Sequence, residues 1–343
     1  MKKLINIGKV VLGNGNIVIQ SMTNTDTKNC IETVKQVNAL ANAGAELVRV
    51  SVPDEESAQA LKKIVELSLV PIIADIHLTA RPALLAIENG ASKIRINPYN
   101  MNRQDIKEIV KKCIEYDIPI RVGVNKGSSK TSKTPTELAH SAVECAKIIE
   151  DMGWNKLVLA VKSSDVIETV KAYRELASIT NYPLHIGLTE AGTKTSGLIK
   201  SAVAIGSLLL DGIGDTVRVS LAGNPIDEVF AAKRILRAVG KDKNFVEIIA
   251  CPTCARTNIM VQELAERMEN LTKDICIPLK IAVMGCTING IGESKGADFG
   301  VAGGKEKSVI FKNGLVYKTV QNKYIEEELG KLLQNYINDK RLL

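Results

Sequence analysis

The chain has 343 residues, more than one ordinary domain needs, and its apolar content of 45% is that of a globular core. Lys and Arg number 45 against 38 Asp and Glu, which gives a net charge of +7. No apolar run reaches the roughly 18 to 20 residues that a bilayer crossing requires, and Gly8, Lys9 and Gly13 interrupt any secretion signal. We therefore expect a cytoplasmic protein with no membrane segment.

The rare residue types exclude several classes of function. Four Phe, seven Tyr and one Trp are too few for a protein that stacks on nucleic-acid bases, so we expect no nucleic-acid partner. Three His exclude multi-histidine zinc chemistry. Seven Cys is an odd number, and clustered cysteines in a reducing compartment indicate metal binding or catalysis more often than disulfides.

From residue 17 to about 240, a short β-branched run followed by a helical pattern occurs eight times. Helix-start residues agree with this repeat, because Asp54, Thr79, Thr134 and Asn224 each stand where a helix is expected to begin. The predicted strands are 17–21, 46–52, 70–76, 93–98, 118–125, 156–163, 183–189 and 216–223. Eight such units in about 250 residues predict an α/β fold, namely a (β/α)8 TIM barrel spanning 1–243.

Polar residues interrupt strands that should otherwise be apolar. They recur at even spacing, which places them on one face of each strand, near the carboxyl ends where barrel enzymes build their sites. The candidates are Arg49 and Ser51, Asp75 and His77, Arg95 and Asn97, Arg121 and Asn125, Lys162, His185, Glu190, and Arg218 with Ser220. We expect these side chains to converge on one barrel mouth.

Four arginines and a lysine at one mouth predict a polyanionic ligand such as a diphosphate. The alternative is that they fill the barrel interior as ion pairs, but Asp75 and Glu190 cannot balance all of them. His77 and His185 are candidates for binding phosphate or moving a proton. No complete ATP-binding loop or dinucleotide fingerprint is present.

The repeat stops near Lys243, and residues 244–343 are expected to form a smaller α+β domain. From 244 onward 13 basic residues face 12 acidic ones, so the basic excess belongs to the barrel. Cys251 and Cys254 follow a predicted strand at 246–250, and Cys286 follows another at 280–284. A CxxC with a distant third thiol suits either zinc or an iron–sulfur cluster, and a zinc site would need Cys276 as its fourth ligand.

The sequence resembles a known family, the iron–sulfur 4-hydroxy-3-methylbut-2-enyl diphosphate synthases of the non-mevalonate isoprenoid route. The resemblance covers essentially the whole chain and is carried by motifs in both parts. These are 48–53 (VRVSVP), 74–77 (ADIH), 93–98 (KIRINP), 121–125 (RVGVN), 189–192 (TEAG), 250–257 (ACPTCART), 283–293 (VMGCTINGIGE) and 298–304 (DFGVAGG). Tyr99 and Ile291 depart from it, since the family usually has Gly and Pro there.

The resemblance implies reductive ring opening and dehydration of 2-C-methyl-D-erythritol 2,4-cyclodiphosphate, with two electrons from ferredoxin or flavodoxin. It implies a [4Fe-4S] cluster held by Cys251, Cys254, Cys286 and Glu293, the glutamate being the exchangeable ligand. Glu190 is our choice for moving a proton. The family's homodimer, in which the cluster domain of one subunit closes over the barrel of the other, is expected here too.

Two other classes remain open at this point. A zinc-stapled barrel lyase or aldolase acting on a sugar phosphate would keep the anion site and use no electrons. A nucleic-acid-modifying iron–sulfur protein would use the net charge of +7, but the sequence has no aromatic platform or basic run for it.

Overall fold

The computed structural model describes residues 2–126, 134–288, 290–294 and 296–341, without the side chains of 291, 293, 340 and 341. The chain divides into two compact units, Met1–Lys241 and Asp242–Leu343. Each has its own hydrophobic core. The first unit carries the eight-stranded sheet and the second a five-stranded sheet.

The first unit is the predicted (β/α)8 barrel, which confirms the fold class. Its strands are parallel and adjacent in the order β8-β7-β6-β5-β4-β3-β10-β9, and a parallel bridge between Leu159 and Leu184 joins β8 to the start of β9. The strands are β3 (Val18–Met22), β4 (Leu47–Val52), β5 (Ile72–Ile76), β6 (Lys93–Ile96), β7 (Ile120–Asn125), β8 (Leu157–Lys162), β9 (His185–Ile186) and β10 (Thr216–Val217).

The last two barrel strands are shorter than predicted. Regular pairing covers two residues each instead of 183–189 and 216–223. Beyond it the two backbones come so close that a Cβ on Gly187 would lie 2.5 Å from the carbonyl oxygen of Arg218. A glycine at this position lets the two chains lie against each other as they turn toward the barrel mouth.

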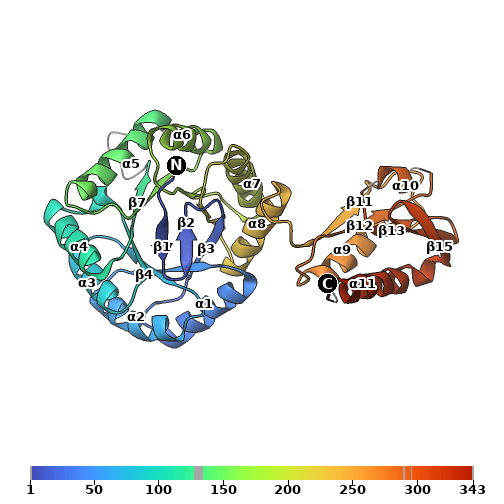
Figure 1. Ribbon diagram of the computed structural model, residues 1–343, viewed down its shortest axis with the longest axis horizontal. Coiled ribbons are helices and arrows are strands. Elements are labelled where there is room, and N and C mark those ends of the chain that lie inside the picture. Colours follow the sequence, from blue (N-terminus) through green and yellow to red (C-terminus); the bar gives the residue numbers. More distant parts are fainter. Residues whose placement is uncertain (1, 127–133, 289, 295, 342–343) are drawn as a thin grey trace. The chain divides into compact units, whose positions relative to one another are not determined.

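Helices surround the barrel, one after each strand (Figure 1). They are α1 (Cys30–Ala43), α2 (Glu55–Leu67), α3 (Ala80–Glu88), α4 (Arg103–Tyr116), α5 (Pro135–Glu150), α6 (Val166–Ile179), α7 (Lys194–Leu210) and α8 (Pro225–Ala238), with a short η1 (Pro98–Asn100) before α4. In the described part of the chain, no helix is long and apolar enough to cross a membrane.

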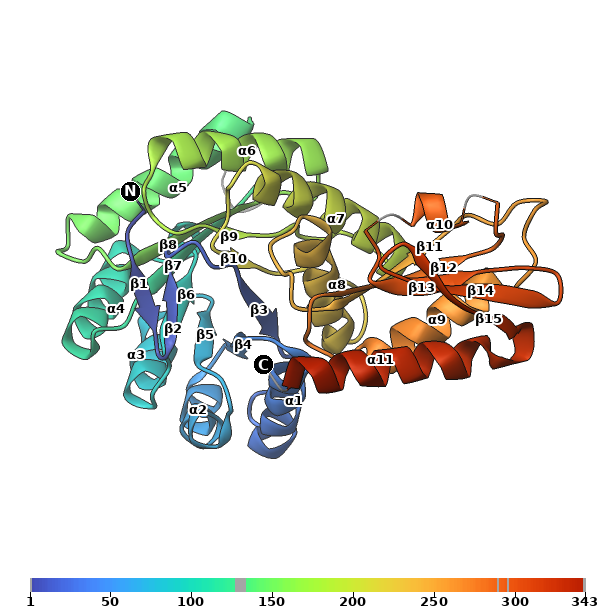
Figure 2. The same ribbon diagram turned by 45° about the vertical axis from the view of Figure 1, so that its right-hand side comes forward.

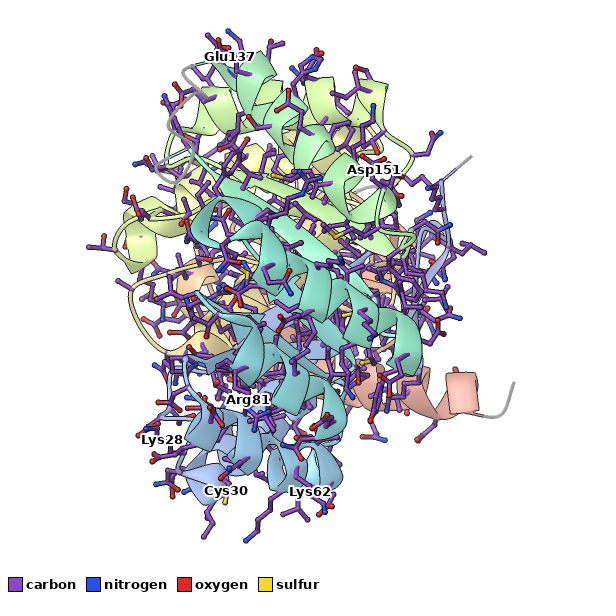
Figure 3. The ribbon with its side chains drawn as sticks, turned by 90° about the vertical axis from the view of Figure 1, so that its left-hand side faces the viewer. Lys28, Cys30, Lys62, Arg81, Glu137 and Asp151 are labelled. Atoms are coloured by element: carbon purple, nitrogen blue, oxygen red, sulfur yellow. The ribbon has the colours of Figure 1, made fainter. Side chains whose placement is uncertain are left out.

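Most of the predicted helix starts are capped as expected. Asp54 and Asn224 accept backbone N–H bonds, and Thr134 forms a reciprocal capping box with Glu137. Figure 3 shows Glu137 and Asp151 at the two ends of α5. Thr79 is the N-cap residue of α3, as predicted, but its side chain makes no capping bond. Instead the Asp105 carboxylate of α4 accepts the N–H of Ala80 at 3.1 Å.

A short N-terminal hairpin, β1 (Ile5–Ile7) and β2 (Val10–Leu12), was not predicted. Ile5, Ile7 and Leu12 are buried against residues at the amino-terminal ends of barrel strands, namely Val18, Leu47, Ile73 and Val158. The hairpin lies across that end of the barrel (Figure 1). The other end, where the strands reach their carboxyl termini, is left for the polar residues.

The second unit is a mixed sheet in the order β11-β12-β13-β14-β15, parallel for its first three strands and antiparallel for the rest. Helices α9 and α11 cover one face and α10 lies on the other (Figure 2). The elements are β11 (Val246–Ala250), α9 (Val261–Thr272), β12 (Leu279–Met284), α10 (Gly290–Glu293), β13 (Phe299–Ala302), β14 (Lys307–Lys312), β15 (Leu315–Gln321), η2 (Asn322–Tyr324) and α11 (Ile325–Arg341).

Candidate active site

The barrel opens at the carboxyl ends of its strands into a pocket with a cavity volume of about 80 Å³. Seven of the residues predicted from the sequence line this pocket: Arg49, Arg95, Arg121, Asn125, Lys162, Arg218 and Ser220. They come from β4, β6, β7 and β8 and from the segment after β10. Gly123, Ala160 and Thr189 also line it, and sequence reasoning missed them because small or neutral side chains give no charge signal.

Asp75 is the acidic partner beneath this basic surface. Its carboxylate lies 3.1 Å from Nη1 of Arg95 and 3.7 Å from Nε of Arg49. Burial alone would raise the pKa of Asp75, but Arg49 and Arg95 overcome that effect and hold it at about 2. Asp75 is therefore ionised at neutral pH and orients two of the arginines.

Positive charge in the pocket exceeds what Asp75 can balance. Arg121 is 2% exposed, and its Nε and Nη1 atoms have no hydrogen-bond partner among the described residues. Burial lowers the pKa of Lys162 well below its ordinary value, and the neighbouring charges of Arg121 and Arg218 lower it further. Buried donors without partners are costly, so a bound anion would stabilise this arrangement.

Besides Asp75 and Ser51, four predicted barrel residues lie outside the set that lines the pocket. His77 follows β5, with Nε2 3.1 Å from Oγ of Ser51. Asn97 is buried and caps η1. His185 is fully buried and shares a hydrogen bond with Thr216, and burial holds its pKa well below the ordinary value. Glu190 is exposed, directly after the pocket-lining Thr189, with φ of +52°.

Two further residues of the barrel interior were not predicted as parts of the site. Lys93 is fully buried two positions before Arg95, and its ammonium group has no partner among the described residues. Burial lowers its pKa well below the ordinary value, and Arg121 adds to this. Met22, at the end of β3, accepts hydrogen bonds from Arg49 and Arg218 on its sulfur. A methionine in a strand normally indicates core packing, so Met22 could not be selected from the sequence.

In the second unit, the cysteine loops follow adjacent parallel strands. Cys251 directly follows β11, and its N–H donates to Val283 on β12, while Cys286 lies two residues beyond β12. Between them, the N–H of Gly285 donates to Sγ of Cys251 at 3.0 Å. The N–H of Asn258 donates to the Gly285 carbonyl at 2.8 Å, which ties the two loops together.

These loops suit thiolates. Backbone and side-chain hydrogen bonds from Arg256 lower the pKa of Cys254, which is exposed. Cys276 precedes β12, and a six-residue strand spans roughly 20 Å, so it lies at the end of the sheet opposite Cys286. The side chain of Glu293, the predicted fourth ligand, lies outside the described part of the structure, although its backbone belongs to α10.

Among the side chains that the structure describes, no three His, Cys, Asp or Glu converge closely enough to hold one metal ion. A cluster places less strict demands on proximity, because each thiolate binds a different iron atom and the thiolates stand further apart than the ligands of one ion. The two tied loops, with a backbone N–H directed at a cysteine sulfur, therefore fit a cluster better than a four-ligand zinc site that uses Cys276.

Fold and site together define a (β/α)8-barrel protein with an anion pocket at the carboxyl ends of its strands, followed by a unit that carries cysteine loops. Comparison with protein families makes this specific. Residues 2–233 match the GcpE TIM-barrel domain and residues 247–335 the GcpE protein C-terminal domain, so the chain belongs to the GcpE family. The resemblance inferred from the motifs is thereby confirmed.

Relatives cover the chain almost completely. The 4-hydroxy-3-methylbut-2-en-1-yl diphosphate synthase (flavodoxin) of Caldanaerobacter subterraneus subsp. tengcongensis is 47% identical over 352 residues and covers 99% of both chains. The protein of the same name from Thermotoga maritima is 46% identical over 342 residues, again covering 99% of both.

Two solved structures match about 70% of the chain. A type I 3-dehydroquinate dehydratase from Clostridium difficile gives a TM-score of 0.54 at 12% identity, covering 71% of this chain and 100% of that one. A dihydropteroate synthase from Xanthomonas albilineans gives 0.52 at 15% identity, covering 70% and 99%. At such low identity the likeness shows the fold and nothing about the ligand.

Proposed function

We propose that this chain is a 4-hydroxy-3-methylbut-2-enyl diphosphate synthase, which reductively opens 2-C-methyl-D-erythritol 2,4-cyclodiphosphate. The observation that carries the proposal is the convergence of five basic side chains on one barrel mouth, with only two buried carboxylates, Asp75 and Glu228, beside them among the described residues. Full-length relatives near 46% identity have this enzyme's name. The reaction takes up two electrons and two protons, breaks a ring C–O bond and releases one water.

In this proposal the barrel holds both phosphates. Arg121, whose Nε and Nη1 have no partner among the described residues, and Lys162 supply positive charge to the pocket. Asn125 and Ser220 also line the pocket and can donate hydrogen bonds to phosphate oxygens. Arg95 is held in place by Asp75. Binding of the anion would offset the repulsion among the buried cations, so much of the binding free energy is available to fix the ring's orientation.

Glu190 is the proposed proton-transfer residue. It adopts a left-handed backbone conformation, with φ of +52°, that residues other than Gly rarely adopt and that commonly marks functional positions. Thr189, the residue before it, lines the pocket, so Glu190 directly follows the pocket wall along the chain. A carboxylic acid there can protonate the leaving oxygen as the ring opens.

Cys251, Cys254 and Cys286 would hold a [4Fe-4S] cluster, with Glu293 as the fourth, exchangeable ligand. Such a cluster supplies electrons one at a time to a substrate that needs two. The loop geometry supports this donor set, since Cys251 and Cys286 follow neighbouring parallel strands and the Gly285 N–H points at sulfur. Zinc is the second candidate for the same thiols.

Flavodoxin is the proposed electron donor, because the relatives' names include it, and ferredoxin is the alternative. A homodimer is also proposed, with the cluster domain of one subunit closing over its partner's barrel. It is supported by exposed apolar side chains on α7 and the neighbouring α8, where Ile199 is 61%, Val203 52% and Phe230 49% exposed. A cytoplasmic location completes the proposal.

Replacing Arg121 tests the function. Arg121→Met removes a buried cation at similar length, so we expect it to weaken pyrophosphate binding ten- to a hundredfold, since a charge-assisted contact contributes about 1.5 to 3 kcal/mol. Turnover of the cyclic diphosphate should fall at least as much, while the absorbance of the cluster stays unchanged. Unchanged pyrophosphate affinity by calorimetry, with the iron intact, would contradict the anion site.

A further inference from the structure

Strand β3 lies between β4 and β10, the strands that lead to Arg49 and Arg218. Its last residue, Met22, is in register with Arg49. The sulfur of Met22 accepts Nε of Arg49 at 3.2 Å, Nη2 of Arg49 at 2.9 Å and Nη1 of Arg218 at 3.4 Å. Three N–H donors from two pocket-lining guanidinium groups thus converge on one thioether.

The carboxylates near these arginines are more distant than the sulfur. Arg49 lies 3.7 Å from Asp75, and Arg218 lies 3.6 Å from Glu228, against the roughly 2.7 to 2.9 Å of a charge-assisted hydrogen bond. Oε1 of Glu228 also accepts the N–H of Leu221, and burial raises the pKa of Glu228. Met22 is therefore the acceptor that holds the Nε and Nη2 atoms of Arg49 in place.

A thioether is an unusual hydrogen-bond acceptor between two arginines, and its weak acceptor strength and lack of charge explain its effect on them. It is a weak, uncharged acceptor on a flexible, polarisable side chain. A carboxylate at the same place would hold the arginines firmly but neutralise them, and a leucine would fill the space but accept nothing. Arg49 and Arg218 also repel each other, an effect that contributes to lowering the pKa of Arg49.

We propose that Met22 is a positioning residue of the anion pocket, whose sulfur holds Arg49 and Arg218 side by side while leaving both charges free for the substrate's phosphates. This inference rests on the proposed function for the identity of the substrate, but the pyrophosphate pocket itself can be probed without turnover. The alternative is that Met22 only fills space at the end of β3.

Full-length protein purified anaerobically with its cluster is compared as wild type, Met22→Leu and Met22→Gln. Leucine keeps the volume and removes the acceptor, whereas glutamine keeps a neutral acceptor. Met152→Leu is the matched control, because Met152 is also half-buried and packs on the barrel core outside the pocket. Calorimetry with pyrophosphate gives the dissociation constant, and steady-state assays with the cyclic diphosphate give kcat and KM.

We expect Met22→Leu to raise the pyrophosphate dissociation constant and the KM about three- to tenfold with little change in kcat, and Met22→Gln to stay within about twofold of wild type. Met152→Leu should change neither. Wild-type affinity in Met22→Leu, equal weakening in the leucine and glutamine variants, or a leucine variant that fails to fold would each overturn the inference and assign Met22 to packing. A wild-type chain that binds pyrophosphate but leaves the cyclic diphosphate unchanged would instead contradict the proposed function.

Discussion

Lys162 shows how a single residue couples ligand binding to protons. Lys162 is 8% exposed in the pocket, and burial together with the charges of the neighbouring arginines lowers the pKa of its ammonium group. A bound diphosphate would offset the repulsion from the arginines and raise the pKa of Lys162 again. At a pH between the pKa of Lys162 in the free protein and its pKa in the complex, the complex holds a proton that the free protein lacks.

Pyrophosphate binding should therefore take up protons and weaken as the pH rises through that window. The uptake is measured by calorimetry in buffers of different ionisation enthalpy, after subtracting the same titration of Lys162→Met. The methionine variant should lose the proton uptake attributable to this side chain and bind several-fold more weakly. Identical proton uptake in both proteins would show that Lys162 is already charged in the free pocket.

Many individual residues of the pocket could be predicted from the sequence. Charged residues at even spacing in otherwise apolar strands identified Arg49, Arg95, Arg121, Lys162 and Arg218, because period-two spacing fixes the face of a strand. Met22 and Lys93 could not be found this way. A methionine's role as an acceptor, and a lysine's lack of a partner, depend on which neighbours the folded barrel places around them.

At the scale of elements, close packing of the cysteine loops depends on glycine. A Cβ on Gly303 would lie 2.7 Å from the carbonyl oxygen of Gly285 and 2.8 Å from Cγ1 of Ile259. Both contacts are shorter than real Cβ atoms allow, and one is with backbone. The turn between β12 and Cys286 would have to move.

Gly303→Ala should therefore lower the iron content of anaerobically purified protein by at least half, without affecting pyrophosphate binding in the barrel. Gly330→Ala is the control, because Gly330 lies in α11 with nothing near the added methyl group, and alanine favours a helix. Iron analysis and calorimetry give both readouts. Full iron content in Gly303→Ala would mean that the loop tolerates the shift.

Cysteine replacements test whether the cluster lies at the carboxyl end or the amino end of strand β12. Cys286→Ser removes a proposed ligand at the carboxyl end of β12, and we expect the iron content and visible absorbance to fall severely. Cys276→Ser changes an exposed cysteine at the opposite end of the strand and should retain both. A cluster lost with Cys276→Ser, or fully kept with Cys286→Ser, would refute the assignment.

Some helices and strands could be predicted from the sequence and others could not. Eight barrel strands were predicted because each precedes a long periodic helix, and these were found. The hairpin β1–β2 was missed, because three-residue strands carry no measurable period and form by packing Ile5, Ile7 and Leu12 on the barrel. No elements were predicted after residue 284, where β13 to β15 and α11 complete the second sheet.

In the whole molecule, the two units have different proposed roles. The proposed substrate contacts come from the barrel and the proposed cluster ligands from the second unit, and each unit has a core of its own. The proposed enzyme therefore combines two separable properties in one chain, anion binding and electron delivery. Neither property alone distinguishes this enzyme from a zinc-stapled barrel lyase or from an iron–sulfur protein with another ligand.

An anaerobic single-turnover experiment tests this combination most directly. Full-length protein kept reduced by an excess of dithionite is mixed with an equal amount of 2-C-methyl-D-erythritol 2,4-cyclodiphosphate, so that the cluster can deliver both electrons in turn. The product is identified by mass spectrometry, and iron, sulfide and zinc are measured on the same protein preparation. We predict about four iron and four sulfide per cluster-loaded chain, no stoichiometric zinc, and conversion to 4-hydroxy-3-methylbut-2-enyl diphosphate. A fully loaded, reduced protein that binds pyrophosphate yet leaves the cyclic diphosphate intact would contradict the account.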